Sequence, residues 1–228
     1  MFILAIEGNI GTGKSTLGHL IEKEISSIDD VEFIQEPVHK WVELKDKDGN
    51  ILDKFYKDQD RWSYTFQHNA FITRAQDIMK HRDKKMIIIE RSVLTDRNVF
   101  AKLLHENNKI SDMEWKLYTQ WYEWLTNEFT IKPDRFVYLK ADAQTSYKRM
   151  LKRLRDEEDG VPFEYINQVH QKHEEWMNKL EHVDIIDVNE DFVSNEANQK
   201  RLLDTVMSII SEELTKIKND DKYFPSGC

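Results

Sequence analysis

A glycine-rich stretch near the start of the chain limits what this sequence can fold into more than any other feature. It reads Gly8-Asn9-Ile10-Gly11-Thr12-Gly13-Lys14-Ser15 and fits the phosphate-binding pattern G-x-x-x-x-G-K-[ST] at every fixed position. An apolar run, Phe2 to Ile6, precedes it, and apolar residues at helical spacing follow it: Leu17, Leu20, Ile21 and Ile25. Lys14 can reach the outer phosphates, and Ser15 can offer its hydroxyl to Mg²⁺. The stretch therefore predicts a strand, a triphosphate-binding loop and a helix, but not what receives the phosphate.

Apolar runs recur along the chain, separated by long segments of helical periodicity. They are Phe2 to Ile6, Val31 to Ile34, Met86 to Ile89, Phe136 to Leu139 and Val183 to Val188. This alternation is typical of an α/β fold in which a parallel sheet, here of about five strands, carries helices on both faces. At 228 residues we expect a single domain, residues 1–228, with a flexible tail over about 219–228.

The overall composition limits which binding partners and which cellular compartment we expect for this protein. The net charge of −9 argues against a nucleic-acid polymer, because proteins that bind one gather Lys and Arg. No run of about 18 apolar residues occurs, so we expect no membrane partner. The single cysteine, Cys228, cannot pair within the chain, which fits a reducing compartment and a cytoplasmic protein.

Charged residues follow two of the predicted strands directly. Glu36 comes after the second strand, beside Pro37, and Glu90 and Arg91 come after the third. Because ligands bind outside the carboxyl ends of strands in open α/β sheets, these residues are predicted to reach the same edge as the phosphate-binding loop. An acid there can bind Mg²⁺, and an arginine can bind a phosphate or orient a neighbouring carboxylate.

A helix predicted over roughly Asp60 to His81 carries two long polar side chains on one side. Phe66, Gln67, Ala70 and Arg74 share that side by helical spacing. If the side faces the edge with the phosphate-binding loop, Gln67 and Arg74 form a hydrogen-bonding wall around the small Ala70. If it faces solvent, they have no special role, and periodicity alone leaves both interpretations open.

The densest basic cluster follows the fourth predicted strand, on a helix that Asp142 can cap. Its members are Lys148, Arg149, Lys152, Arg153 and Arg155. The cluster runs directly into the acidic stretch Asp156 to Gly160, so one interpretation is a self-neutralising, solvated helix end. The other is a lid over about residues 149–162 whose arginines stabilise charge on a transferring phosphate.

An aromatic helix is predicted to begin at Ser111, where Ser111 and Glu114 form a capping-box pattern. Its large side chains cover more than one face: Trp115, Tyr118, Trp121, Tyr122, Trp124, Leu125 and Phe129. We expect one face to meet the sheet and the surplus to form a subunit interface, which predicts a homodimer through residues 111–129. The alternative is a helix enclosed in its own core.

The polar turn Asp46 to Asn50 matches two other motifs by letters alone. Asp46-x-x-Gly49 resembles a GTPase segment, but it follows no apolar strand and no guanine-reading segment occurs. It also resembles the start of a calcium loop, yet its glycine stands at the fourth position and the closing glutamate is missing. A solvated loop is predicted.

Taken together, several segments in order resemble the deoxynucleoside kinases of the deoxycytidine kinase, deoxyguanosine kinase and mitochondrial thymidine kinase family, and deoxycytidine kinases most closely. The segments are the loop from Gly8 to Thr16, Glu36-Pro37-Val38 with Trp41, Arg61 to Gln67, Glu90-Arg91-Ser92, Asp96-Arg97, Arg153 to Glu158 and Asp187 to Phe192. The resemblance implies a P-loop kinase fold, a nucleoside triphosphate such as ATP as donor, Mg²⁺, and phosphorylation of the nucleoside 5′-hydroxyl for salvage.

The resemblance also implies roles for individual residues. Glu36 would be the general base, held by Arg91, and charge on the moving phosphoryl would be stabilised by Lys14, Arg149, Arg153 and Arg155. Ser15 and Glu90 would bind Mg²⁺. The donor nucleotide would be bound by Gly8, Asn9, Ile10, Gly11, Thr12, Gly13, Lys14, Ser15, Thr16, Arg153, Asp191 and Phe192. The nucleoside would contact Glu36, Val38, Trp41, Leu52, Tyr56, Phe66, Gln67, Ala70, Arg74, Arg91, Asp96, Phe100 and Glu158, with Tyr56 and Glu158 on the 3′-hydroxyl.

Base preference follows from the residues beside Gln67. A glutamine amide can present either polarity, so Gln67 alone accepts cytosine or thymine. By the resemblance, relatives that prefer thymidine carry apolar residues where this chain has Arg74 and Asp96. An Arg74–Asp96 ion pair would favour an exocyclic amino group and crowd a thymine methyl. We therefore expect deoxycytidine to be preferred, with some purine deoxynucleoside activity and poor thymidine use.

Two other functions fit the phosphate-binding loop. A nucleoside monophosphate kinase, such as thymidylate kinase, shares the loop and lid but needs extra basic residues for its acceptor, where this chain has Glu36 and Glu158. A nucleotide-dependent binding module would need no catalytic base, so it predicts that Glu36→Gln leaves slow ATP turnover intact.

Overall fold

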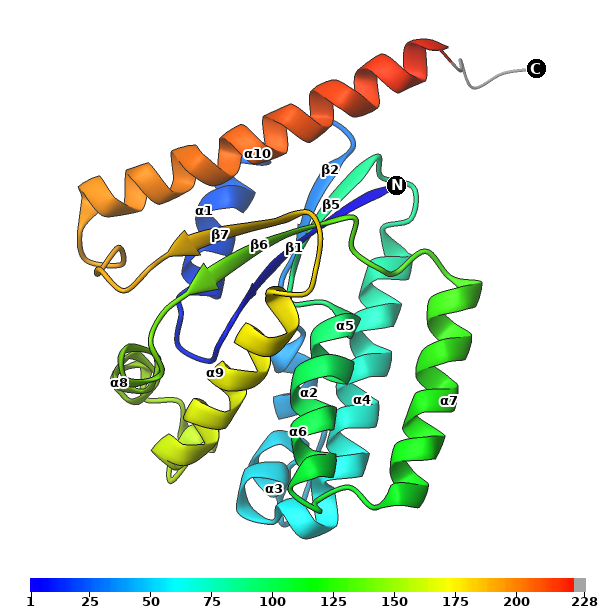
Figure 1. Ribbon diagram of the computed structural model, residues 1–228, viewed down its shortest axis with the longest axis vertical. Helices are drawn as coiled ribbons and strands as arrows, with labels where there is room; N and C mark the ends of the chain where they lie inside the picture. The colour runs from blue at the N-terminus through cyan, green and yellow to red at the C-terminus, as the bar shows by residue number, and fades with distance from the viewer. Residues whose placement is uncertain (224–228) are drawn as a thin grey trace.

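The computed structural model describes residues 1–223, and these contain the predicted five-stranded parallel sheet. Its strand order is β2-β5-β1-β6-β7, and every neighbouring pair is parallel (Figure 1). The strands are β1 (Phe2–Gly8), β2 (Val31–Ile34), β5 (Met86–Glu90), β6 (Arg135–Lys140) and β7 (Val183–Asp187). The sheet reverses strand order around β1, so the carboxyl end of β1 lies at the topological switch point where ligands bind in such folds.

Helices cover both faces of the sheet, as predicted (Figure 1). They are α1 (Lys14–Ile25), α2 (Val38–Glu43), α3 (Ile51–Lys57), α4 (Gln59–Lys80), α5 (Val93–Thr95), α6 (Ala101–Glu106), α7 (Asp112–Glu128), α8 (Ala143–Arg153), α9 (Phe163–Met177) and α10 (Glu196–Tyr223). A π-helical turn, Asp96–Phe100, joins α5 to α6, and a 3₁₀ turn, Asp156–Glu158, follows α8. No helix among the described residues is long and apolar enough to cross a membrane.

Alternation along β1 divides the core into two parts. Ile3 and Ala5 pack with residues of α4, α6 and α9, whereas Leu4 and Ile6 pack with α1 and α10 on the other face. All four side chains are fully buried. Burial on both faces explains why the strands read as continuous apolar runs rather than as alternating patterns.

The aromatic helix forms as predicted but packs elsewhere. Ser111 Oγ accepts a hydrogen bond from the Glu114 backbone N–H, and the Glu114 carboxylate accepts one from the Ser111 N–H, which completes the capping box. The expectation that one face meets the sheet is wrong. Helix α7 lies outside α4 and α6 and packs against those helices, because they already cover this face of the sheet (Figure 1).

Three smaller predictions also need correction. The turn from Asp46 to Asn50 is not a plain loop, because β3 (Lys45–Asp46) and β4 (Gly49–Asn50) pair there as an antiparallel hairpin. Residues 219–223, assigned to a flexible tail, continue α10, and the remainder of the predicted tail, including Cys228, lies outside the described residues. Asp142 stands at the start of α8, but its side chain makes no capping hydrogen bond.

Candidate active site

A cavity of about 700 Å³ opens at the carboxyl ends of β1, β2 and β5. The phosphate-binding loop, the ends of β2 and β5, α3, α4, α8 and the segment 155–158 contribute to its walls. Segments that are far apart in the sequence therefore meet at the predicted edge of the sheet, where the carboxyl ends of the parallel strands lie.

The phosphate-binding loop is a tight turn between β1 and α1. Gly13 has a φ of 93° and lies so close to Phe192 that a Cβ would meet its ring at 2.4 Å. Only glycine fits such a left-handed, closely approached position. The Lys14 ammonium donates to the Asn9 carbonyl at 2.7 Å, and the Asn9 amide anchors the loop to the Ile166 carbonyl of α9.

Lys14 is buried beneath this turn. Burial and the neighbouring Arg91 lower the pKa of its amine to about 7, although Glu90 and Glu36 oppose this shift. A polyphosphate beside the amine would raise its pKa again, because an opposite charge favours the ammonium form. The lysine is thus placed to gain its full charge when a phosphate binds.

Ser15 and Glu90 form an oxygen pair suited to Mg²⁺. Ser15 Oγ donates to Glu90 Oε1 at 2.7 Å, and the other Glu90 oxygen lies 3.5 Å from the Glu36 backbone nitrogen. Mg²⁺ favours hydroxyl and carboxylate oxygens, with substrate phosphates and water completing its shell. Among residues 1–223 no group of three or more Asp, Glu, His or Cys side chains could hold a metal by itself, so an ion here would depend on the nucleotide.

A buried arginine pairs with two acids that line the cavity. Arg74 Nη2 donates to Glu36 Oε1 at 2.6 Å, and Arg74 Nε donates to Asp96 Oδ2 at 2.9 Å. Arg74 and Asp96 are 5% and 1% exposed. Periodicity did not decide whether this side of α4 faces the site or solvent, and the structure shows that it faces the cavity. The Arg74–Asp96 ion pair expected from the sequence is formed.

The two acids that share Arg74 have opposite pKa shifts. Burial would raise the pKa of Glu36, but Arg91, Arg74 and Lys14 together lower it to about 2. Burial raises the pKa of Asp96 to about 6 in spite of Arg74, and the charge of Glu36 adds to that increase. Three cations therefore keep Glu36 ionised, whereas the ion pair of Asp96 with Arg74 does not offset the burial of Asp96.

Arg91 is held in an uncommon backbone conformation at the end of β5. Its φ is 62°, and a non-glycine residue in this region typically costs about 1 kcal/mol or more unless its surroundings impose it. Its guanidinium donates to the Gly8 carbonyl at 3.1 Å, lies 4.8 Å from the Phe100 ring centre and reaches within 3.7 Å of Glu36. The strained turn thus brings a cation between the phosphate-binding loop and the carboxylate.

The other end of the cavity is aromatic. Phe66 packs edge-on to Trp41 at 5.3 Å and stacks on Phe55 at 4.6 Å, measured between ring centres. Gln67 is 2% exposed, and its Oε1 has no hydrogen-bond partner in the described structure. A buried, unpartnered amide oxygen between aromatic walls suits a flat ligand with a polar edge.

The segment after α8 brings arginines and Glu158 together. Glu158 is buried, and its Oε1 accepts hydrogen bonds from Arg153 and, at 3.2 Å, from Arg155. Arg149 donates to the carbonyls of the 188–190 segment. All three arginines line the cavity, although each is already paired with groups of this chain.

Most of the residues named by the resemblance line this one cavity. Those that do so are Ile10, Gly11, Gly13, Lys14, Ser15, Thr16, Glu36, Val38, Trp41, Leu52, Tyr56, Phe66, Gln67, Ala70, Arg74, Glu90, Arg91, Asp96, Phe100, Arg149, Arg153, Arg155, Glu158 and Asp191. Gly8, Asn9, Thr12 and Phe192 do not. Phe192 is buried against Gly13, so it supports the loop from beneath.

Sequence reasoning missed two aromatic residues of the wall, Phe55 and Tyr165. Leu52, Phe55 and Tyr56 have the i, i+3, i+4 spacing of one helical face, so the pattern around Tyr56 could have identified Phe55. Tyr165 lies in the first turn of α9, and no local signal distinguishes it.

Comparison with known proteins shows which protein family has this site. A family model described as deoxynucleoside kinase matches residues 4–211. The chain belongs to the deoxynucleoside kinase family. Among its relatives, a probable deoxycytidine kinase of fowlpox virus (strain NVSL) is 39% identical over 217 residues, covering 92% of this chain and 88% of the relative.

Two further relatives extend this comparison. Deoxycytidine kinase 2 of Gallus gallus is 36% identical over 241 residues, covering 91% of this kinase and 90% of the relative. A mitochondrial deoxyguanosine kinase of Xenopus laevis is 30% identical over 240 residues, with 91% and 89% covered. The predicted family and the P-loop kinase fold are therefore confirmed, and the chain is a deoxynucleoside kinase with a small nucleoside as substrate.

Proposed function

We propose that this kinase transfers the γ-phosphoryl group of ATP, or another nucleoside triphosphate, to the 5′-hydroxyl of deoxycytidine with the help of Mg²⁺. Purine deoxynucleosides are secondary substrates and thymidine is a poor one. The observation that carries the base preference is the buried Arg74–Asp96 pair, in the wall of the same cavity as the unpartnered amide oxygen of Gln67. Asp96 can accept a hydrogen bond from an exocyclic amino group, and the Arg74 side chain fills the space that a thymine methyl would need.

Glu36 and Arg91 act on the attacking hydroxyl in this proposal. With a pKa near 2, Glu36 is ionised at neutral pH and accepts the hydrogen bond of the 5′-hydroxyl. So low a pKa gives little driving force for proton transfer, so orientation of the nucleophile is the larger part of its contribution, and the proton moves late. Arg91, placed between Glu36 and the loop, fixes this geometry.

Charge on the transferring group is stabilised from two sides. Lys14 acts on the donor phosphates, and Arg149, Arg153 and Arg155 approach them from the lid. Ser15 and Glu90 would hold Mg²⁺, which would supply further positive charge at the same phosphates. Phosphoryl transfer depends mainly on such positioning and electrostatic stabilisation. Tyr56 and Glu158 bind the 3′-hydroxyl, so both α3 and the lid contact the sugar.

The remaining residues complete the two binding sites in this proposal. Asp191 and the loop from Gly8 to Thr16 bind the donor nucleotide, together with Arg153 and, from beneath, Phe192. Val38, Trp41, Leu52, Phe66, Ala70 and Phe100 pack around the nucleoside.

Comparison of nucleosides with nucleotides as acceptors tests the reaction. We expect deoxycytidine to be phosphorylated and deoxycytidylate or thymidylate not to be, because Glu36 and Glu158 would repel an acceptor phosphate. Faster phosphorylation of either monophosphate would support a nucleoside monophosphate kinase instead. Unchanged turnover of ATP in Glu36→Gln, with no nucleoside product in either protein, would support a binding module.

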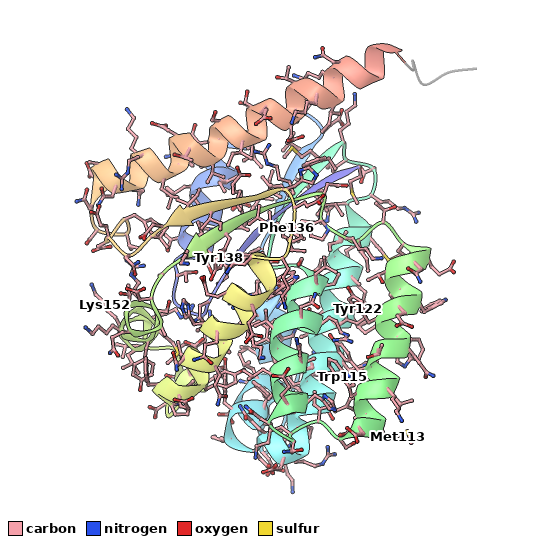
Figure 2. All side chains as sticks on the ribbon, viewed as in Figure 1. Met113, Trp115, Tyr122, Phe136, Tyr138 and Lys152 are labelled. Carbon is pink, nitrogen blue, oxygen red and sulfur yellow. The ribbon has the colours of Figure 1, made fainter. Side chains whose placement is uncertain are left out.

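We also propose that the kinase forms a homodimer through α7. Figure 2 shows Trp115 and Tyr122 on the side of α7 that faces α6 and α4, with Met113 directed away from them. Trp121 and Trp124 are 46% and 50% exposed, and Met113 and Leu117 are exposed beside them. Such an apolar surface is larger than single scattered residues produce, and a second copy of the chain would cover it. Light scattering at micromolar concentration is expected to give twice the chain mass, and a monomer would contradict the proposal.

A further inference from the structure

The hydroxyl of Thr73 on α4 both donates and accepts a hydrogen bond. It lies 2.8 Å from the Asn69 carbonyl oxygen and 3.0 Å from the Ala70 carbonyl oxygen, and Trp41 Nε1 donates to it at 3.0 Å. An indole N–H can only donate, and a hydroxyl has a single proton. The Thr73 proton therefore goes to the helix backbone, and the Thr73 oxygen is the acceptor for Trp41.

The Trp41 ring that this bond orients lies in the cavity wall. It is 4% exposed, contacts Phe66 edge-on, and has the guanidinium carbon of Arg74 at 5.2 Å from its centre. Arg74 is the cation that pairs with Glu36 and Asp96. A rotation of the indole would therefore disturb the aromatic wall and the surroundings of Arg74 together.

Helix α2, which carries Trp41, depends on contacts with other elements. It has six residues, and no side chain caps its N-terminus after Pro37, so it is too short to be stable alone. Two successive residues of α2 bind positions four apart on α4, because Lys40 pairs with Asp77 and Trp41 donates to Thr73. The second contact fixes a ring that lines the cavity, whereas Lys40 and Asp77 lie outside the cavity wall.

We propose that Thr73 is a positioning residue that fixes the orientation of the Trp41 indole and so shapes the nucleoside-binding end of the cavity. Thr73 lies outside the cavity wall, so its effect reaches the site through Trp41. Without the hydroxyl, the buried indole N–H loses its acceptor, which is costly enough for the ring to rotate toward another one. Nucleoside binding then has to restore the orientation. This inference rests on the proposed assignment of the aromatic end of the cavity to the nucleoside.

Thr73→Val tests the proposal, because valine keeps the shape of threonine and lacks the hydroxyl. With the deoxynucleoside that the wild-type enzyme uses best, we expect the nucleoside KM to rise about five- to tenfold, and the KM for ATP with Mg²⁺ to change by less than about twofold. Thr73→Ser keeps a hydroxyl that can bond the same carbonyls, so it should return the nucleoside KM to within about twofold of wild type. A loss of folded enzyme would lower the apparent kcat but would not separate the two KM values.

Two further variants separate the orientation of the ring from the docking of α2. Lys40→Met removes the ion pair with Asp77 and leaves the indole hydrogen bond, so we expect a nucleoside KM within about twofold of wild type. Trp41→Phe has no indole N–H. Addition of Thr73→Val to it should therefore change the nucleoside KM by less than about twofold.

The indole N–H of Trp41 also gives a direct spectroscopic readout. Labelling with ¹⁵N-tryptophan gives one indole signal for each of the six tryptophans, and Trp41→Phe identifies the signal of Trp41. Because a hydrogen bond deshields the proton, we expect this signal to shift upfield in Thr73→Val and to return in Thr73→Ser. Thr126→Val is the matched control, since Thr126 on α7 donates in the same way to the Tyr122 carbonyl at 2.8 Å. It should keep the Trp41 signal and both KM values.

Several results would overturn the proposal. They are an unchanged nucleoside KM or an unshifted Trp41 signal in Thr73→Val, equal rises in the two KM values, no recovery in Thr73→Ser, a further rise in the Trp41→Phe background, and the same loss in Lys40→Met. Failure of the proposed function is visible separately, because the wild-type enzyme would then phosphorylate a monophosphate faster than a nucleoside.

Discussion

Removal of the buried Arg74 should lower the free energy of unfolding far more than removal of Arg74 and Asp96 together. Arg74→Met leaves Asp96, which is 1% exposed, without its cation. It also removes a hydrogen-bond donor to Glu36. Breaking a buried ion pair on one side typically costs about 3 to 5 kcal/mol. In a chain of this size each kcal/mol shifts the melting temperature by about 2 to 4 °C, so the expected fall is about 6 to 20 °C.

The partner variants are expected to behave differently. Asp96→Ala leaves Arg74 bound to Glu36 and relieves the burial of a carboxylate whose pKa is raised to about 6, so its cost should stay below about 2 kcal/mol. The double variant Arg74→Met with Asp96→Ala leaves no unpaired charge except Glu36, which Arg91 still approaches at 3.7 Å. We expect it to melt above the Arg74→Met single variant.

The assay compares four proteins: the wild type, the two single variants and the double variant. It measures their thermal unfolding and their kcat/KM values for thymidine and deoxycytidine. The double variant should raise the thymidine to deoxycytidine ratio by about tenfold or more, a change of about 1.4 kcal/mol, because it opens space for the methyl group and removes the acceptor for an amino group. Melting temperatures in which the two single losses simply add would refute the ion-pair argument. An unchanged substrate ratio would refute the argument for base preference.

Three further predictions concern the loop and Glu36. Glu36→Gln should lower kcat by about 10²- to 10⁴-fold while an ATP analogue still binds by calorimetry, and a loss below tenfold would contradict its role as base. The pKa of Glu36 falls from 4.5 in the unfolded chain to about 2 in the folded one, so its stabilising contribution is complete above pH 4.5 and is lost as pH falls toward 2. The gap in melting temperature between wild type and Glu36→Gln should accordingly shrink from pH 6 to pH 3, and a constant gap would contradict this. Gly13→Ala should abolish ATP-analogue binding because its Cβ meets Phe192. Gly160→Ala, which also has a positive φ (81° against 93°) but open space around it, should cost only about 1 to 2 kcal/mol of stability and keep binding.

The sheet could be predicted from sequence because its strands are buried on both faces. Runs such as Met86 to Ile89 carry no polar residue, and the charged residues that follow them mark the carboxyl edge. Glu36, Glu90 and Arg91 could be placed at one edge for this reason. Periodicity fixed the side of α4 that carries Gln67 and Arg74 but not its direction, since a helical pattern does not say what the face meets.

The remaining features depend on tertiary contacts. The pattern of α7 showed that one face of the helix is buried. Only the packing of α4 and α6 decides that this face contacts those helices and not the sheet. The packing of Phe192 against Gly13 joins segments from opposite ends of the sequence, so no local pattern indicates it. The hydrogen bond from Asn50 to Glu157 joins residues too distant in sequence for any local pattern to indicate.

The kcat/KM of the wild-type kinase for the four deoxynucleosides, measured with ATP and Mg²⁺, tests the central claim most directly. The arrangement of Gln67, Arg74 and Asp96 predicts the highest value for deoxycytidine, lower values for deoxyadenosine and deoxyguanosine, and the lowest for thymidine. A highest value for thymidine would contradict it.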